Sequence, residues 1–116
     1  MEKLLVYHNP GCSKSRGALE ILRERDVEFD VIEYMKDPLD QATLEHCLDL
    51  LPDAPAELVR KDKNFKELGL NEADYETREQ VVALLMEHPK LMQRPIVIRG
   101  NKAVIARPSD KVLELL

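Results

Sequence analysis

One short segment concentrates residue types that can perform nucleophilic chemistry, the stretch from His8 to Arg16 that reads HNPGCSKSR. We expect its Cys12 at or next to the first residue of a helix, where unpaired backbone N–H groups and the helix dipole favour negative charge. A cysteine in that setting often has a pKa well below the value of about 8.5 of a free thiol. The sequence therefore predicts a reactive thiolate at position 12.

The first turn of the same helix would also offer donors to an oxyanion. These donors belong to Ser13, Lys14, Ser15 and Arg16. Lys14 and Arg16 add positive charge, and the Ser15 hydroxyl, three residues after the cysteine, can point back at the sulfur. The alternative is that Cys12 is merely a small buried residue of a loop, and the polar, cationic surroundings argue against it.

Two other anion-binding motifs are excluded by single residues. A Walker A loop needs glycine immediately before Lys14, where this chain has Ser13, and another at position 8, which is histidine. A loop of the tyrosine-phosphatase type needs arginine six residues after the cysteine, where this chain has Ala18. The nucleotide-binding and phosphatase hypotheses lose their main support here.

The elements that must position this segment follow from the apolar pattern. Leu4 to Tyr7 reads as a buried strand, Ser13 to Arg25 as an amphipathic helix, and Val27 through Tyr34 as a second strand. A strand, a helix and a strand in this order form a βαβ unit, which is parallel and right-handed. Cys12 would then follow the first strand of that unit.

The rest of the chain predicts a helical middle and a final hairpin with a helix. The expected elements are a helix at Leu44 to Leu51, short helical turns at Ala56 to Arg60 and Phe65 to Leu70, a helix from its N-cap Thr77 to His88, strands at Ile96 to Ile98 and Ala103 to Ile105, and a last helix opened by Pro108 and Ser109. The fold class is α/β: a thioredoxin-like β-α-β / β-β-α core with a helical insertion between its halves, in one domain spanning residues 1–116.

Three arginines stand at the edges of these elements. Arg60 ends a short helical turn, Arg94 precedes the hairpin, and Arg107 leaves it. Each alone would be read as a solvated surface residue. In this topology the hairpin ends lie beside the first βα loop, so their convergence on Cys12 becomes a testable expectation.

The composition of the chain argues against several classes of function. The chain has 116 residues and a net charge of −5, which argues against nucleic-acid binding. The apolar run from Val81 to Met86 is too short for a membrane span, and the N-terminus lacks the apolar core of a secretory signal. The two cysteines form neither a disulfide framework nor a metal-ligand pattern, and Cys47 lies on an apolar helical stripe. We expect no metal, a structural Cys47 and a cytoplasmic location.

The segment from Tyr7 to Arg16, together with Arg94 to Val97 and Arg107 to Ser109, resembles the glutaredoxin-coupled arsenate reductase (ArsC) family over essentially the whole chain. The resemblance implies that Cys12 attacks arsenate and that the catalytic arginines Arg60, Arg94 and Arg107 bind the oxyanion. It implies that His8 and Ser15 help to keep Cys12 as a thiolate. It also implies glutathione as co-substrate, glutaredoxin as partner, no bound cofactor and a monomeric protein. By the same likeness, we expect a cis bond before Pro95.

Two alternatives stay open. The Cys-x-x-Ser spacing from Cys12 to Ser15 is also that of a monothiol glutaredoxin-like oxidoreductase, although the arginines favour arsenate. Some relatives instead regulate transcription through RNA polymerase. Those proteins commonly use a Cys-x-x-Cys redox switch, whose second cysteine is Ser15 here.

Overall fold

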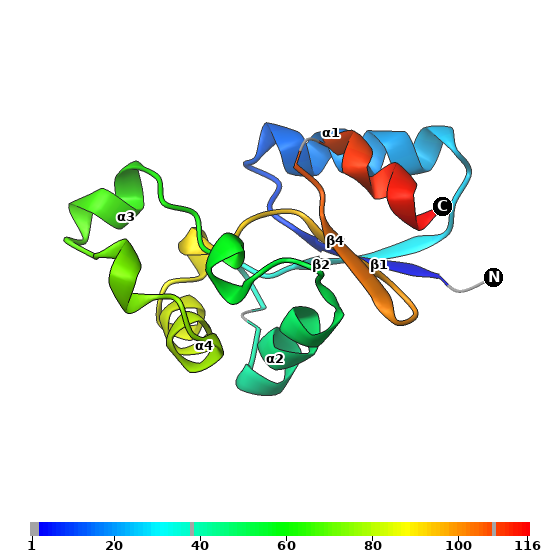
Figure 1. Ribbon diagram of the computed structural model, residues 1–116. Helices are drawn as coiled ribbons and strands as arrows, with labels where there is room; N and C mark the ends of the chain where they lie inside the picture. Colours follow the sequence, from blue (N-terminus) through cyan, green and yellow to red (C-terminus); the bar gives the residue numbers. More distant parts are fainter. Residues whose placement is uncertain (1–2, 38, 108) are drawn as a thin grey trace.

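The computed structural model describes residues 3–37, 39–107 and 109–116, and its centre is a four-stranded mixed sheet (Figure 1). The strand order is β2-β1-β3-β4, with β1 parallel to β2 and antiparallel to β3. The strands are β1 (Leu4–His8), β2 (Phe29–Glu33), β3 (Ile96–Arg99) and β4 (Lys102–Ile105). This arrangement confirms the predicted thioredoxin-like core.

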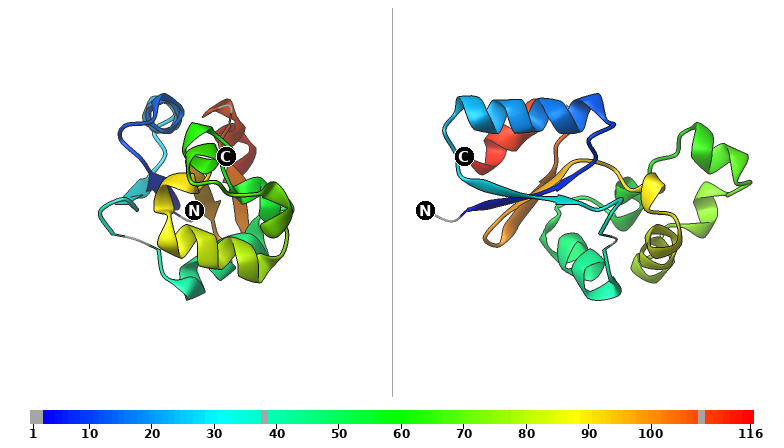
Figure 2. Two further views of the ribbon diagram at one scale, coloured as in Figure 1. Left: turned by 90° about the vertical axis from the view of Figure 1, so that its left-hand side faces the viewer. Right: turned by 180° about the vertical axis from the view of Figure 1, so that it is seen from behind.

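Helices cover both faces of the sheet. They are α1 (Ser13–Glu24), α2 (Gln41–Leu50), α3 (Lys63–Glu67) and α4 (Arg78–Glu87), with the short 3-10 helices η1 (Pro55–Leu58), η2 (Glu72–Asp74), η3 (Pro89–Leu91) and η4 (Ser109–Leu115). Figure 2 shows α1 and the C-terminal η4 on one face and the inserted helices on the other. The insertion extends past the sheet, and the molecule measures 42 × 26 × 23 Å.

Two apolar clusters, one on each face, hold these layers together. Because successive residues of a strand point to opposite faces, Val6 belongs to the cluster under α1 while Tyr7 belongs to the cluster under α2 and α4. Cys47 is fully buried in the second cluster, as its apolar stripe predicted. Cys12 and Cys47 are both free thiols. Cys47 therefore packs on the sheet face opposite the helix that Cys12 begins.

Side-chain hydrogen bonds at the N-termini of two helices show which residues set where those helices begin. Thr77 caps α4: its hydroxyl accepts from the Gln80 N–H at 3.2 Å, and the Gln80 side chain accepts from the Thr77 N–H at 3.1 Å. This reciprocal pair is a capping box, and it confirms the predicted N-cap. Asp40 caps α2 in a similar way by accepting from the Thr43 N–H at 2.8 Å.

Two predicted elements differ from the structure. The second strand was expected from Val27 to Tyr34 but spans only Phe29–Glu33, because Asp26 adopts a left-handed turn with φ 57° and Val27 still donates to the Leu22 carbonyl of α1 at 3.2 Å. The last helix is a 3-10 helix beginning at Ser109. Pro108, which was expected to open it, lies outside the described residues.

The sheet brings three segments to one edge. The parallel pair β1 and β2 ends in register at His8 and Glu33, so the residues that follow each strand lie side by side. Strand β3 starts at this edge, where Ile96 faces Tyr7. The Arg94–Pro95 bond before it is cis, as expected from the resemblance. The loop that carries Cys12, the end of β2 and the start of β3 therefore meet.

Candidate active site

Cys12 is the N-cap residue of α1. Its backbone is extended, with φ −103° and ψ 123°, and its carbonyl accepts the first helical hydrogen bond from the Arg16 N–H at 3.0 Å. On the loop side, the Cys12 N–H donates to the Asn9 carbonyl at 3.0 Å. These bonds fix the half-buried cysteine over the first turn of the helix, where the sequence predicted it.

The surroundings of the thiol favour its ionised form. Burial raises the pKa of Cys12, but the Ser15 N–H, the Arg94 guanidinium and the Lys14 N–H outweigh this effect and hold the pKa below that of an ordinary thiol. The backbone donors come from the helix terminus, and the charged donor comes from the segment before β3. A thiolate is thus stabilised by two parts of the fold that are far apart in sequence.

The three predicted arginines share one electrostatic neighbourhood with the sulfur. Burial lowers the pKa of Arg60, the charges of Arg94 and Arg107 lower it further, and Asp62 and Cys12 oppose this. Asp62 is an ion-pair partner of Arg60, with 3.7 Å between Nη2 and Oδ2. The Arg60 guanidinium therefore lies within electrostatic reach of Cys12, Arg94 and Arg107.

Backbone pairing explains how distant segments deliver these arginines. The Arg60 N–H donates to the Leu91 carbonyl at 2.6 Å, and the Gln93 N–H donates to the Leu58 carbonyl at 2.8 Å. This short ladder ties the Arg60 segment to the one that carries Arg94. Arg94 is held further by a bond from its Nη1 to the Lys90 carbonyl at 2.9 Å.

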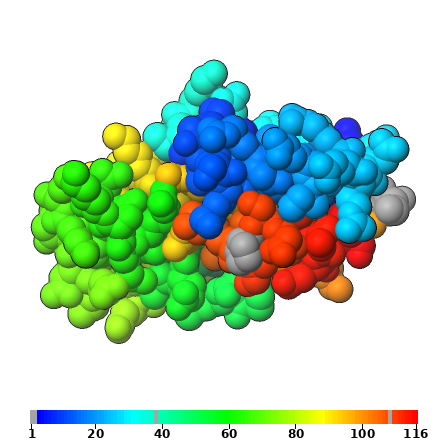
Figure 3. Space-filling model, turned by 90° about the horizontal axis from the view of Figure 1, so that it is seen from above, coloured from blue at the N-terminus to red at the C-terminus, as the bar shows by residue number. Residues whose placement is uncertain are grey.

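Arg107 comes from the other end of the hairpin. The Ala106 N–H donates to the Pro95 carbonyl at 2.9 Å, which joins the chain after β4 to the cis-proline segment. The Ser109 hydroxyl donates to the Lys14 carbonyl at 2.7 Å and so attaches the same stretch to the first turn of α1. Figure 3 shows the start of the chain in blue lying against this C-terminal part in orange and red.

His8 and Ser15 occupy the site but make different contacts from those expected. The Ser15 hydroxyl is buried and accepts from the Asn9 N–H at 3.1 Å, so the group of Ser15 that acts on the thiolate is its backbone N–H. His8 is buried at the end of β1, where burial lowers the pKa of its ring, Arg23 and Arg16 lower it further, and Glu33 opposes them. An imidazole in this environment is neutral near pH 7 and adds no positive charge.

The remaining predicted oxyanion donors lie on the exposed rim. Ser13, Lys14 and Arg16 have exposed side chains. The Arg16 Nη1 donates to the Pro10 carbonyl at 2.8 Å, which braces the loop, whereas Lys14 acts on Cys12 through its backbone N–H. The structure places the guanidinium groups of Arg94 and Arg60 near the sulfur, and that of Arg107 near Arg60.

Sequence reasoning missed two residues at this site, Asn9 and Tyr34. Besides its bonds to Cys12 and Ser15, Asn9 accepts from the Gly11 N–H through Oδ1 at 3.0 Å, and so organises the whole loop. Tyr34 is buried next to it, directly after β2. The available signal was positional, since ligands of open α/β sheets bind beyond the carboxyl ends of their parallel strands.

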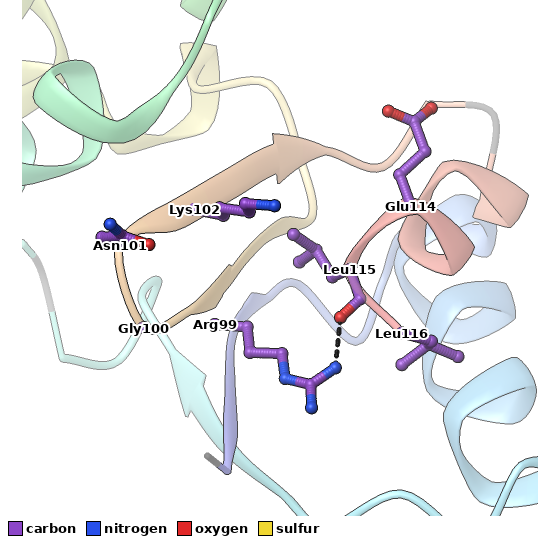
Figure 4. A pocket seen from close by; sticks show the side chains of 7 residues that line it. All are labelled: Arg99, Gly100, Asn101, Lys102, Glu114, Leu115 and Leu116. Atoms are coloured by element: carbon purple, nitrogen blue, oxygen red, sulfur yellow. Dashed lines mark hydrogen bonds between the residues drawn. The ribbon is translucent and has the colours of Figure 1, made fainter. Parts of the chain in front are cut away.

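Other features of the structure lie apart from this site. A hollow of about 690 Å³ at the far end of the hairpin is lined by Arg99, Lys102 and Glu114, and Arg99 donates there to the Leu115 carbonyl (Figure 4). Within residues 3–37, 39–107 and 109–116, no group of three or more His, Cys, Asp or Glu side chains is placed to hold a metal ion. No helix in that part of the chain has the length and apolar character to cross a membrane.

The fold and the site place this protein in the thioredoxin-like class, with an activated cysteine at the start of its first helix. The neighbouring arginines are typical of an anion-binding site within that class. The family model described as the ArsC family matches residues 7–115, and the chain belongs to that family. It is 36% identical to an arsenate reductase of Neisseria meningitidis serogroup A, with all of both chains covered. It is 41% identical to the uncharacterized protein YfgD of Escherichia coli K12, covering 99% of this chain and 98% of that one.

Solved structures agree with this assignment. The structure titled as an arsenate reductase from Vibrio cholerae superimposes with a TM-score of 0.89 at 32% identity, covering 99% of this chain and 98% of that one. The family resemblance read from the sequence is confirmed.

Proposed function

We propose that this protein is an arsenate reductase that uses Cys12 as its nucleophile. The observation that carries the proposal is an activated thiolate with the guanidinium groups of Arg94 and Arg60 near it and that of Arg107 near Arg60. Planar guanidinium groups donate paired hydrogen bonds to tetrahedral oxyanions, and the chain needs such a local positive field because its net charge is −5. Relatives named arsenate reductase over the full length of the chain add support.

The reaction balances with one external thiol. The Cys12 thiolate attacks arsenic(V) and an arsenate oxygen leaves as water, which forms a sulfur–arsenic bond. Glutathione then attacks the Cys12 sulfur; the sulfur–arsenic bond breaks and its electron pair stays on arsenic, which leaves as arsenite, arsenic(III). The two thiols have supplied two electrons and end as a mixed disulfide on Cys12, which glutaredoxin reduces.

The need for an external thiol rests on the placement of the second cysteine. Cys47 belongs to α2 and is buried in the apolar cluster between that helix, α4 and the sheet, while Cys12 begins α1 on the other face. A disulfide needs Cα atoms within about 7 Å, which this layering disfavours. We propose glutathione as co-substrate, glutaredoxin as the reducing partner and a monomer acting in the reducing cytoplasm, with no bound cofactor.

A coupled assay tests the function. Purified protein is incubated with arsenate, glutathione and glutaredoxin, and arsenite is measured. Cys12→Ser is expected to be inactive, and the matched control Cys47→Ser is expected to keep most activity. Mass spectrometry of enzyme trapped during turnover should find one glutathione on Cys12.

Four outcomes would contradict the proposal. An active Cys12→Ser variant would remove the nucleophile. A Cys12–Cys47 bridge, or equal turnover with thioredoxin in the absence of glutathione, would replace the external-thiol step. Reduction of a glutathionylated peptide without any reduction of arsenate would instead favour a glutaredoxin-like oxidoreductase.

A further inference from the structure

Tyr34 places a polar group in the deepest part of the site. Its side chain is only 1% exposed, and it directly follows β2, whose last residue pairs in register with His8. Because β1 and β2 are parallel, Tyr34 lies beside Asn9, the residue that organises the Cys12 loop. The groups near its hydroxyl are the Arg94 guanidinium, the Asn9 side chain and Cys12.

By distance and angle the hydroxyl makes no hydrogen bond to any described residue, although the Arg94 guanidinium and the Asn9 side chain approach its oxygen closely enough to lower the pKa of Tyr34. The Arg94 Nε–H is likewise buried without a partner in the described part of the chain, although Nη1 of the same guanidinium is held by Lys90. An unpaired buried polar group destabilises the folded protein, and such groups recur at functional sites. Two of them close together beside a nucleophile need a common explanation.

The chemistry of the neighbours decides what kind of partner the Tyr34 proton lacks. Arginine only donates hydrogen bonds, and Asn9 turns its Oδ1 to the Gly11 N–H and acts on the Tyr34 oxygen as a donor, which lowers the pKa of Tyr34. The Ser15 and Lys14 N–H groups and Arg94 already stabilise the sulfur as a thiolate. Burial raises the pKa of Tyr34, against the opposing effect of Arg94, so the phenol stays protonated near pH 7 and is a donor.

We propose that the Tyr34 hydroxyl donates a hydrogen bond to an oxygen of the bound oxyanion, alongside Arg94, while the Cys12 thiolate attacks. This makes Tyr34 a substrate-contacting residue that completes the arginine cluster with a neutral donor. The inference rests on the proposed reduction of arsenate at the same site. A fixed donor at a developing negative charge stabilises the transition state more than the ground state, so its loss affects kcat as well as KM.

Tyr34→Phe tests the proposal because it removes only the hydroxyl. Loss of one oxyanion donor typically lowers the rate by about 10²–10³-fold, and we expect about 10- to 100-fold for kcat/KM with arsenate because the charged donors Arg60 and Arg94 remain in the variant. The matched control is Tyr7→Phe, since Tyr7 is buried in the same apolar cluster but its hydroxyl faces Cys47 and Asp40. Its kcat/KM should stay within about twofold of wild type, the range of a substitution remote from the reacting atoms.

Two further measurements separate substrate contact from a structural role. Thermal unfolding of Tyr34→Phe should occur at or above the wild-type temperature, because an unpaired buried hydroxyl has been removed. The pH midpoint for alkylation of Cys12 should not change. A raised midpoint would show that Tyr34 acts by holding Arg94, and a lower unfolding temperature with unchanged kcat would show a packing role; either result overturns the proposal.

Protection of Cys12 from iodoacetamide by arsenate gives a readout that needs no turnover. Wild type should be protected, and Tyr34→Phe should need about tenfold more arsenate for half protection, the ratio expected for one lost hydrogen bond to a charged group. Equal protection and turnover in the two proteins would refute the role of Tyr34 alone. A wild type that neither reduces nor binds arsenate would overturn the proposed function and, with it, this inference.

Discussion

Replacing Arg94 by alanine removes the side chain that links substrate binding to thiolate activation. Arg94 lies close enough to the Cys12 sulfur to lower the pKa of the thiol, and its charge also lowers the pKa of Arg60. One lost oxyanion donor corresponds to a rate loss of about 10²–10³-fold. Arg94 is half-buried, so solvent screens part of its charge, and we expect kcat/KM for arsenate to fall about 30- to 300-fold, roughly 2–3.4 kcal/mol.

The assay compares three variants under the coupled conditions. Arg94→Lys keeps the charge but loses the planar pair of donors, so it should lie between alanine and wild type. Arg99→Ala is the matched control, because Arg99 ends the same strand and donates to the Leu115 carbonyl at the far end of the hairpin. Its activity should remain near that of wild type.

A second readout follows from the contact with sulfur. The pH midpoint for Cys12 alkylation should rise in Arg94→Ala, because a donor to the thiolate and a nearby positive charge are both lost. The reasoning would be refuted by activity within about threefold of wild type together with an unchanged pH midpoint for Cys12 alkylation. A threefold change corresponds to less free energy than one weak hydrogen bond. The oxyanion site would then lie elsewhere.

Three further predictions concern the thiols and the helix termini. In wild type, Cys12 should alkylate with a midpoint below about 8.5, the value of a free thiol, and a midpoint at or above it would contradict the structure. Burial raises the pKa of Cys47 to about 12, above that of the unfolded thiol, so its contribution to stability is present below about pH 9 and lost as the pH rises toward 12. Urea unfolding should record a loss of up to about 1.4 kcal/mol per pH unit, and Cys47→Ala should flatten this slope if the thiol causes it. Thr77→Ala removes the α4 cap and should cost about 1 kcal/mol in the same assay, whereas Thr77→Ser should cost little.

Local patterns in the sequence were sufficient to predict most of the helices and strands and the N-cap position of Cys12. The N-cap position of Cys12 follows from a short strand, a Pro-Gly loop and an amphipathic helix, all within a few residues of one another. The cap at Thr77 and the hairpin that contains Arg99 and Lys102 follow from signals of the same short range. Each of these features depends on contacts between residues that are close together in the sequence. The sequence alone is therefore enough to predict it.

Tertiary structure decided which side chains share the site. The left-handed turn at Asp26 shortened β2, and the register of β2 on β1 then placed Tyr34 beside Asn9. The packing of the segment before β3 against the Cys12 loop placed Arg94 near the sulfur. Spacing along the chain cannot give these contacts, because they depend on strand register and on the burial that follows once distant segments pack.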